Sequence, residues 1–207
     1  MEFSEVIKNR YSCKKFSGEQ IGKDKLDAIL EAGRVAPTAK NLQEQHIYVV
    51  QSESGLETID KLTPCRYNAP TVLIVAYNKN NVFTYPGDKR NSGIEDATIV
   101  ATHLMLAAYN EGVDSCWINF FNPDELSKAF NLPEDEEILM LLDIGVADQT
   151  TAPLPNHNSR KALTLTLSIS ALFIGRAVQK ATYNNHTYPL STVVECVNGN
   201  SNFGEKA

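Results

Sequence analysis

The longest helical pattern in the sequence, residues 94–110, most constrains the fold of this chain. Apolar residues recur in it at helical spacing, and further apolar residues occupy its other faces. A helix that is apolar nearly all round is buried on most of its sides. The segment is therefore expected to be the central helix of the fold or part of a subunit interface. His103 within it is expected to be a packed core residue rather than a catalyst.

Shorter patterns around this helix predict a mixed structure. The run at 71–77 is almost continuously apolar and β-branched, which is typical of a central strand. Asn122, Pro123 and Glu125 combine three helix-start signals: an N-cap, a proline at the first helical position and an acidic third residue. Further helices are expected at 2–9, 23–33 and 54–63, and further strands at 46–50, 115–119, 138–144 and 163–171. This order predicts one α+β domain without internal repeats.

The composition excludes several classes of partner. The 207 residues suffice for one full-sized core, and the net charge of −6 argues against a nucleic-acid-binding surface. No apolar run reaches the roughly 20 residues that span a bilayer, and the first residues lack a signal-peptide pattern. The four cysteines are scattered without a CxxC pair, which favours reduced thiols over a metal site. We therefore expect a cytoplasmic protein that binds neither nucleic acid nor membrane.

A basic stretch near the N-terminus is the first candidate binding site. Arg10, Ser12 and Lys14 occupy alternate positions, so an extended backbone puts their side chains on one face. A guanidinium, a hydroxyl and an ammonium group on one face suit a phosphate monoester. The alternative is a solvated basic connector after the first helix, and these residues alone leave both interpretations open.

The polar segment 36–43 is the second candidate. Pro37 ends the preceding helix, and Thr38 can cap a short turn. Asn41 and Gln43 carry amides that both donate and accept hydrogen bonds, which suits a flat heterocycle. A polar helix–strand connector is the alternative.

Signatures of nucleophilic catalysis, zinc peptidases, P-loops and Rossmann-type dinucleotide sites are absent from the sequence. A second basic pair, Arg160–Lys161, follows the core strands. A chain with cofactor anchors and no evident acid–base pair would leave the chemistry to a bound cofactor.

Taken in order, these motifs resemble the FMN-dependent nitroreductase family over about residues 1–163. The family's first motif, Arg-x-Ser-x-Arg/Lys before an aromatic residue, corresponds to Arg10, Ser12, Lys14 and Phe16. Its Ala-Pro-Ser/Thr-x-x-Asn-x-Gln motif corresponds to residues 36–43. The family pattern also covers 67–70, 94–110, 112–118, 144–145 and the pair Arg160–Lys161.

The resemblance implies a nitroreductase-like α+β fold. Helices would flank a central, mostly antiparallel sheet, and the long helix would lie at the interface of a homodimer. An FMN-binding domain is expected at 1–164. The C-terminal extension at 165–207 does not resemble the family, and it could wrap around a dimer or be a non-native segment.

The resemblance also implies how FMN would be held. Arg10, Ser12 and Lys14 would bind its phosphate and ribityl chain, joined by Arg160 or Lys161. No protein side chain is expected to be catalytic, because the flavin N5 carries the chemistry, and no metal is expected.

Two further segments would contact the flavin ring. Pro37, Thr38 and Asn41 would line it from the partner subunit, with Gln43 near it. The backbone of the strand at 115–119 would approach the isoalloxazine edge, where amide donors stabilise charge on the reduced ring. The residues concerned in that strand are Cys116, Trp117 and Ile118.

The activity that the resemblance implies is electron transfer from NADH or NADPH to a nitroaromatic, quinone, enone or similar acceptor by a ping-pong mechanism. Glu44 and Gln45 stand where the family often has Pro-Trp, which would reshape or open the wall over the flavin and weakens the inference about substrate. Tyr11 replaces a frequent arginine of the basic motif, which removes one positive charge. The alternatives are a flavoenzyme of the same fold with another reaction, such as a dehydrogenase or reductive dehalogenase, and a non-enzymatic anion- or nucleotide-binding protein.

Overall fold

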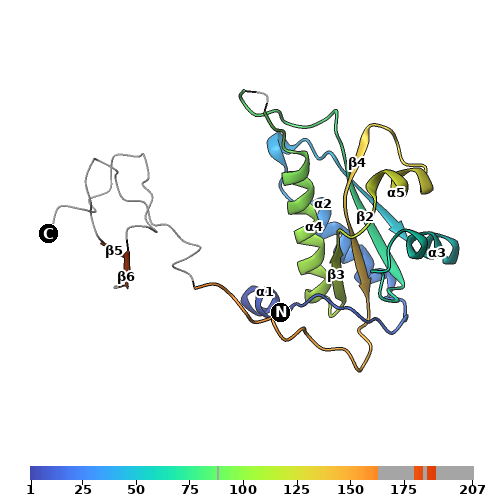
Figure 1. Cartoon of the computed structure of the whole chain (residues 1–207), viewed down its shortest axis with the longest axis horizontal. Coiled ribbons are helices and arrows are strands. Elements are labelled where there is room, and N and C mark those ends of the chain that lie inside the picture. Colours follow the sequence, from blue (N-terminus) through green and yellow to red (C-terminus); the bar gives the residue numbers. More distant parts are fainter. Residues whose placement is uncertain (88, 163–179, 184–185, 190–207) are drawn as a thin grey trace. The chain divides into compact units, whose positions relative to one another are not determined.

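A four-stranded antiparallel sheet forms the centre of the fold (Figure 1). The computed structural model describes residues 1–87, 89–162, 180–183 and 186–189. The sheet has the strand order β1-β2-β4-β3, and every neighbouring pair is antiparallel, as expected from the family resemblance. The strands are β1 (Gln45–Val50), β2 (Thr71–Asn78), β3 (Asp114–Ile118) and β4 (Glu136–Gly145).

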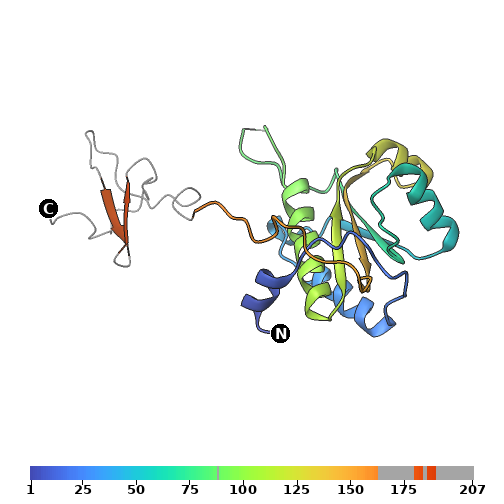
Figure 2. The same cartoon turned by 60° about the horizontal axis from the view of Figure 1, so that its bottom comes forward.

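Helices cover both faces of this sheet. Helices α2 and α4 lie on one face, and α3 and α5 lie on the other (Figures 1 and 2). The short α1 precedes them and contacts α4. The helices are α1 (Phe3–Asn9), α2 (Lys23–Arg34), α3 (Glu53–Leu62), α4 (Gly93–Asn110) and α5 (Pro123–Ala129), with a 3-10 turn η1 (Ala39–Asn41).

The alternation of side chains along β2 divides the core into two clusters. Leu73 packs with Leu104 of α4 in one cluster, and Ile74 packs with Ile59 of α3 in the other. All residues from Thr71 to Tyr77 are buried, because β2 is flanked by two strands and covered on both faces. The central strand that the apolar run predicted is confirmed, because a strand covered on both faces needs apolar side chains at successive positions.

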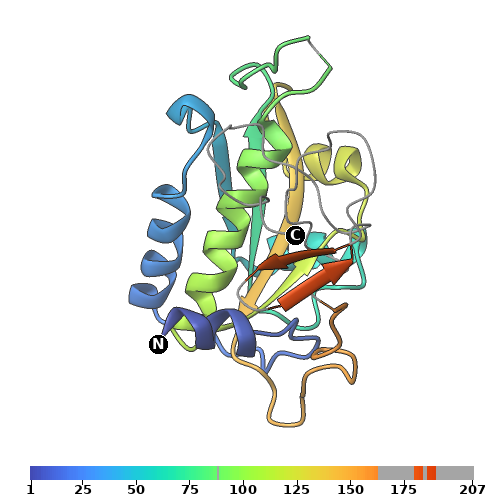
Figure 3. The ribbon, with the colours of Figure 1, turned by 90° about the vertical axis from the view of Figure 1, so that its left-hand side faces the viewer.

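Helices α2 and α4 lie side by side (Figure 3). Their close approach depends on Gly33, because a Cβ atom there would lie 2.7 Å from Cδ2 of Leu104. In the chain by itself, α4 is buried on one face only. Ile94 is 55% exposed and Ile99 is 37% exposed. The burial on most sides that the apolar pattern predicted is therefore not reached within one chain. His103 is half-buried, and its Nδ1 lies 3.3 Å from the Ala32 carbonyl oxygen.

The start of α5 confirms the predicted cap. The Asn122 side chain accepts hydrogen bonds from the Asp124 and Glu125 amides at 3.1 and 3.4 Å. Pro123 occupies the first turn, where its missing N–H costs nothing.

The chain divides into two compact units, residues 1–154 and 155–207. The second contains an antiparallel hairpin of β5 (Lys180–Tyr183) and β6 (His186–Pro189), which the sequence did not predict. The strand expected at 163–171 lies outside the described residues, and the domain boundary expected after residue 164 stays a prediction. No helix in the described ranges is long and apolar enough to cross a membrane.

Candidate functional site

The basic stretch after α1 is extended and bound to the edge of the sheet. Ser12 forms a parallel bridge with Ser115 of β3, and the Cys13 amide donates to the Ser115 carbonyl oxygen at 2.9 Å. Farther along, the Phe16 amide donates to the Tyr67 carbonyl oxygen at 2.9 Å. Because Cys13 and Phe16 are buried, they anchor the segment and turn the intervening polar residues outward.

The first two predicted phosphate ligands lie together. Arg10 Nη2 donates to Ser12 Oγ at 3.5 Å, which agrees with the expectation that alternate residues share a face. Lys14 is exposed, with its ammonium group 6.0 Å from the centroid of the Tyr67 ring. Its positive charge also acts on the Cys116 thiol of β3. Arginine, serine and lysine thus form a donor set beside β3.

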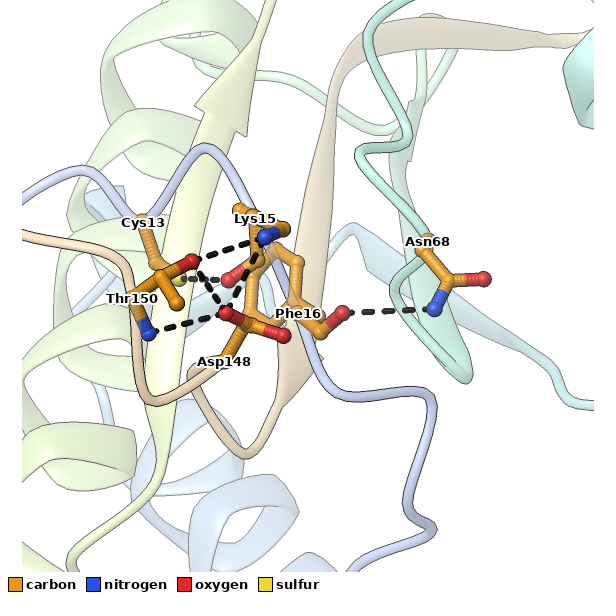
Figure 4. Close-up of polar contacts among 6 residues, drawn as sticks. All are labelled: Cys13, Lys15, Phe16, Asn68, Asp148 and Thr150. Atoms are coloured by element: carbon orange, nitrogen blue, oxygen red, sulfur yellow. Dashed lines mark hydrogen bonds and ion pairs between the residues drawn. The ribbon is translucent and has the colours of Figure 1, made fainter.

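Lys15, the neighbouring lysine, has a structural partner instead. Its ammonium group lies 3.1 Å from Asp148 Oδ1 and donates to Thr150 Oγ1 at 2.7 Å (Figure 4). Hydrogen bonds from Thr150 and then from Lys15 lower the pKa of Asp148 to about 2. The Lys15 backbone carbonyl accepts from the Asp148 amide at 3.0 Å and from Cys13 Sγ at 3.2 Å. Among the described residues Lys14 forms no ion pair, so of the two lysines it remains the candidate phosphate ligand.

Strand β3 offers its backbone rather than its side chains. It is an edge strand of the four-stranded sheet. Cys116 and Ile118 are buried, whereas Trp117 is half-buried and donates from Nε1 to Asn119 Oδ1 at 2.9 Å. The approach of a flavin ring to the backbone of Cys116, Trp117 and Ile118 stays a prediction.

The loop at 37–43 has an unusual backbone. Lys40, Asn41 and Gln43 have positive φ angles of 53°, 56° and 53°, a conformation that costs about 1–2 kcal/mol per non-glycine residue. The loop is held by the Gln43 amide, which donates to Thr38 Oγ1 at 3.0 Å, and by the Ala39 amide, which donates to Asp96 Oδ1 at 2.9 Å. Thr38 therefore stabilises the turn, although it accepts from Gln43 rather than capping η1.

The polar groups of this loop face outward. Pro37, Asn41 and Gln43 are exposed, and Thr38 is half-buried. The Gln43 side chain donates to the Asn41 carbonyl oxygen at 3.3 Å, which orients the two amide-bearing residues relative to one another. Their placement suits the amide-rich contact that the sequence predicts.

Within one chain, the loop and the basic stretch lie near opposite ends of α4 (Figure 3). The loop bonds to Asp96 in the first turn of α4, whereas the basic stretch pairs with Ser115, just after its end. The helix has 18 residues, which at 1.5 Å per residue corresponds to about 27 Å. One chain therefore does not bring the two predicted halves of the site together.

The late basic pair belongs to the second unit. Arg160 donates from Nη1 to the Ser159 carbonyl oxygen at 2.8 Å and also to that of His157. Arg160 and Lys161 are exposed. Their approach to Arg10 stays a prediction.

Two buried acids of the central unit had no role in the sequence interpretation. Asp143 of β4 is fully buried, and neither of its carboxylate oxygens has a hydrogen-bond partner among the described residues. Burial raises its pKa to about 9, against an opposing effect of Arg66. Burial also raises the pKa of Cys116, the residue opposite Asp143 on the paired strand β3, to about 12. Both groups are therefore protonated at neutral pH.

The second acid, Asp96, forms a pair with Glu44. Each is 4% exposed, and burial followed by hydrogen bonding to Asp96 raises the pKa of Glu44 to about 7. The sequence marked Glu44 only as a departure from a family motif that would reshape the wall over the flavin. In the fold it points inward.

Comparisons with known proteins assign the family. The family model described as Nitroreductase family matches residues 7–65 and 65–146. A crystal structure of a nitroreductase family protein from Clostridium difficile 630 is 33% identical, with a TM-score of 0.77, and the match covers 83% of this chain and all of that one. An FMN-dependent nitroreductase from Clostridium difficile R20291 is 25% identical, with a TM-score of 0.61, over 76% of this chain and 98% of that one.

A curated relative gives the same answer. YodC of Bacillus subtilis, named as a candidate NAD(P)H nitroreductase, is 27% identical over 195 residues, which cover 76% of this chain and 93% of the relative. Because the family model spans more than half of the chain, and the sheet and its helices match those of solved family structures, the chain belongs to the nitroreductase family.

Proposed function

We propose that this protein is an FMN-dependent oxidoreductase that takes electrons from NADH or NADPH and passes them to a small-molecule acceptor by a ping-pong mechanism. The single observation that carries the proposal is the contact of Arg10 with Ser12 on the outer edge of β3, beside the exposed Lys14. The names of an FMN-dependent relative and of a candidate NAD(P)H nitroreductase support the choice of cofactor and donor.

The donor set fits the phosphate end of FMN. A guanidinium group can form a two-point contact with phosphate oxygens, while a hydroxyl adds one hydrogen bond and an ammonium group adds a point charge. Arg10, Ser12 and Lys14 supply these three groups. Arg160 or Lys161 would join them at the phosphate, as the family resemblance implies. Lys15 takes no part, because Asp148 and Thr150 hold it.

The remaining contacts would orient the isoalloxazine ring. The backbone of Cys116, Trp117 and Ile118 would border its edge, where N–H donors favour negative charge on the reduced ring. When bound, FMN supplies the redox chemistry, accepting electrons from the nicotinamide and passing them to the acceptor. The protein holds the ring and limits which molecules reach it.

A homodimer would complete the site. The loop with Pro37, Thr38, Asn41 and Gln43 lies about the length of α4 away from the basic stretch, so a second copy would have to supply it. The exposed Ile94 and Ile99 of α4 give such a copy an apolar face to cover. A cavity of about 310 Å³ between α1 and α4 extends that face.

The acceptor class is proposed from the family, with nitroaromatics, quinones and enones as the compounds to test. A different reaction on the same fold, such as a dehydrogenation or reductive dehalogenation, is favoured by one observation: Glu44 stands in the family's Pro-Trp position and turns into the protein. A cytoplasmic location stays a prediction.

The visible spectrum of the purified protein tests the proposal. Flavin absorption bands and oxidation of NADH or NADPH with a quinone or nitroaromatic acceptor are expected. A yellow protein without turnover would favour another flavin reaction. A colourless protein that FMN does not reconstitute would contradict the proposal and favour a non-enzymatic anion-binding role.

A further inference from the structure

Two buried carboxyl groups meet beneath the loop at 37–43. Glu44 immediately precedes β1, and its carbonyl oxygen accepts from the Asn78 amide at 2.8 Å. Asp96 lies in the first turn of α4, and its Oδ1 accepts from the Ala39 amide. Ser92 Oγ lies 3.5 Å from Glu44 Oε1 and serves as a donor to it. The acids thus join the start of α4 to the start of β1 and to the loop.

These two groups cannot both be ionised at low cost. Glu44 Oε2 and Asp96 Oδ2 have no donor partner when both acids are charged, and no lysine, arginine or histidine among the described residues forms an ion pair with either. Two like charges buried together favour the uptake of one proton. That proton gives one acid an O–H group that can donate to the other.

Glu44 is the acid that keeps the proton. Burial is the main cause that raises its pKa to about 7, and hydrogen bonding to Asp96 adds to it. Asp96 accepts the Ala39 amide and lies in the first turn of a helix, where the helix dipole favours negative charge.

The loop above the pair needs support from within. Three of its residues, Lys40, Asn41 and Gln43, hold left-handed backbone conformations that non-glycine residues rarely adopt. The Ala39–Asp96 hydrogen bond ties the loop to α4, and Asn81 Nδ2 donates to the Leu42 carbonyl oxygen at 3.3 Å. A change in the charge of the pair therefore acts directly on the loop.

We propose that Glu44 is a positioning residue whose protonated carboxyl group donates to Asp96 and so holds the loop from Thr38 to Gln43, and that ionisation of Glu44 loosens this loop. The effect on the cofactor rests on the proposed function, in which the loop lines the flavin. The effect on the loop itself does not.

Other ionisable groups near the pair have partners of their own. Lys40 Nζ lies 4.6 Å from the centroid of the Phe83 ring, and Arg90 lies over the Tyr85 ring. Further pairs on the elements packed nearby are Tyr85 with Glu95, Arg90 with Glu95, Tyr77 with Glu137, His46 and Tyr48 with Glu136, and Arg34 with Glu31. His103 of α4 lies against the Ala32 carbonyl oxygen. Because each has such a partner, Glu44 is the group expected to titrate against Asp96.

The sign of the pH effect follows from linkage. The folded loop keeps the Glu44 proton up to about pH 7, whereas an exposed glutamate releases it near its ordinary value of 4.5. The closed loop therefore loses stability as the pH rises between these values, and the loss levels off above about pH 8. Between pH 6 and pH 8 the opening equilibrium should increase about tenfold.

Hydrogen exchange of the Ala39 and Gln43 amides in the full-length, FMN-free protein tests the proposal. Protection factors, corrected for intrinsic exchange, should fall about tenfold from pH 6 to pH 8 in the wild type. Glu44→Gln should abolish this fall, because its amide donates to Asp96 at every pH. Glu57→Gln, at an exposed position of α3, should behave as the wild type does.

A second variant keeps the test independent of the folding of the first. Asp96→Asn retains an acceptor for the Ala39 amide and removes the like charge but leaves Glu44 buried, so its protection should fall less from pH 6 to pH 8 than in the wild type. The proposal would be overturned if the protection factors of the wild type did not change between pH 6 and pH 8, or if Glu44→Gln still showed the tenfold fall.

FMN retention separates this proposal from the proposed function. If the exchange results are as expected, and FMN affinity in the wild type but not in Glu44→Gln falls over the same pH range, both are supported. If exchange is as expected while FMN affinity is flat in both proteins, the loop is positioned by Glu44 but does not line the flavin. Flat exchange with normal FMN binding contradicts the positioning role alone.

Discussion

Asp143 of β4 lies directly opposite Cys116 of β3, and both residues are buried. The carboxyl group has no hydrogen-bond partner among the described residues. A neutral acid in this position avoids the much larger cost of a buried charge. Asp143 lies on the strand that pairs with β3, the strand whose outer edge we propose for the flavin.

Replacing Asp143 should therefore change how stability depends on pH. The pKa of about 9 in the folded protein lies above the ordinary aspartate value of 3.8, so the folded state retains a proton that the unfolded state releases. This group lowers stability as the pH rises from about 4 to 9. At 1.4 kcal/mol per pH unit, Asp143→Asn should gain at most about 4 kcal/mol relative to the wild type between pH 5 and pH 8.

Urea denaturation of both proteins at pH 5 and pH 8 measures this difference. Glu57→Gln, which changes an exposed acid on α3, provides the control. If the free energies of unfolding of Asp143→Asn and the wild type differ by the same amount at pH 5 and pH 8, the folded protein does not hold the Asp143 proton over this pH range.

The thiols should differ in their reactivity. Cys13 and Cys116 are buried, with pKa values raised mainly by burial, whereas Cys65 is half-buried. Because the thiolate is the reactive form, iodoacetamide at pH 7.5 should modify Cys65 well before the other two. Peptide mapping by mass spectrometry over time measures the rates of these three cysteines, which lie in the described part of the chain, and faster modification of Cys116 would show that its thiol is accessible.

Removal of the basic side chains should weaken cofactor retention. Arg10→Ala and Lys14→Ala each remove a charge-assisted contact worth about 1.5–3 kcal/mol, so each should raise the FMN dissociation constant roughly 10- to 100-fold while the fold remains intact. Flavin fluorescence after dialysis reports retention, and circular dichroism reports the fold.

Lys15→Ala is the matched control, because Lys15 is bound to Asp148 and Thr150 and should not contact the phosphate. Its effect on FMN should be less than about threefold, since an exposed ion pair contributes little. If Arg10→Ala and Lys14→Ala both stay fully yellow, the phosphate assignment is wrong even though the family is right.

A charge on the open face of α4 should disrupt self-association. Ile99 is 37% exposed in the single chain, and an interface would bury it. Ile99→Glu would place an unpaired carboxylate there and should shift the mass in solution toward the monomer, with loss of FMN. Lys61→Glu, on α3 across the sheet, should leave the mass unchanged. A wild-type monomer that retains FMN would refute the two-chain site.

Local patterns in the sequence determined most of the secondary structure and part of the candidate site. The apolar run at 71–77 is a buried strand, and Asn122 caps α5, because both depend on neighbouring residues. Arg10 and Ser12 share a face because extended chains alternate their side chains. The ordered motifs sufficed to predict the family and the antiparallel sheet.

Only the tertiary structure decided which groups meet across the sheet and beneath the loop. The Ala39 amide bonds to Asp96 from 57 residues away, and Asp143 lies opposite Cys116 only because β4 pairs with β3. Nothing in the local sequence shows that Glu44 turns inward or that Asp143 is isolated from donors. Their protonation states depend on burial and on distant neighbours, which are properties of the packed chain rather than of any short segment.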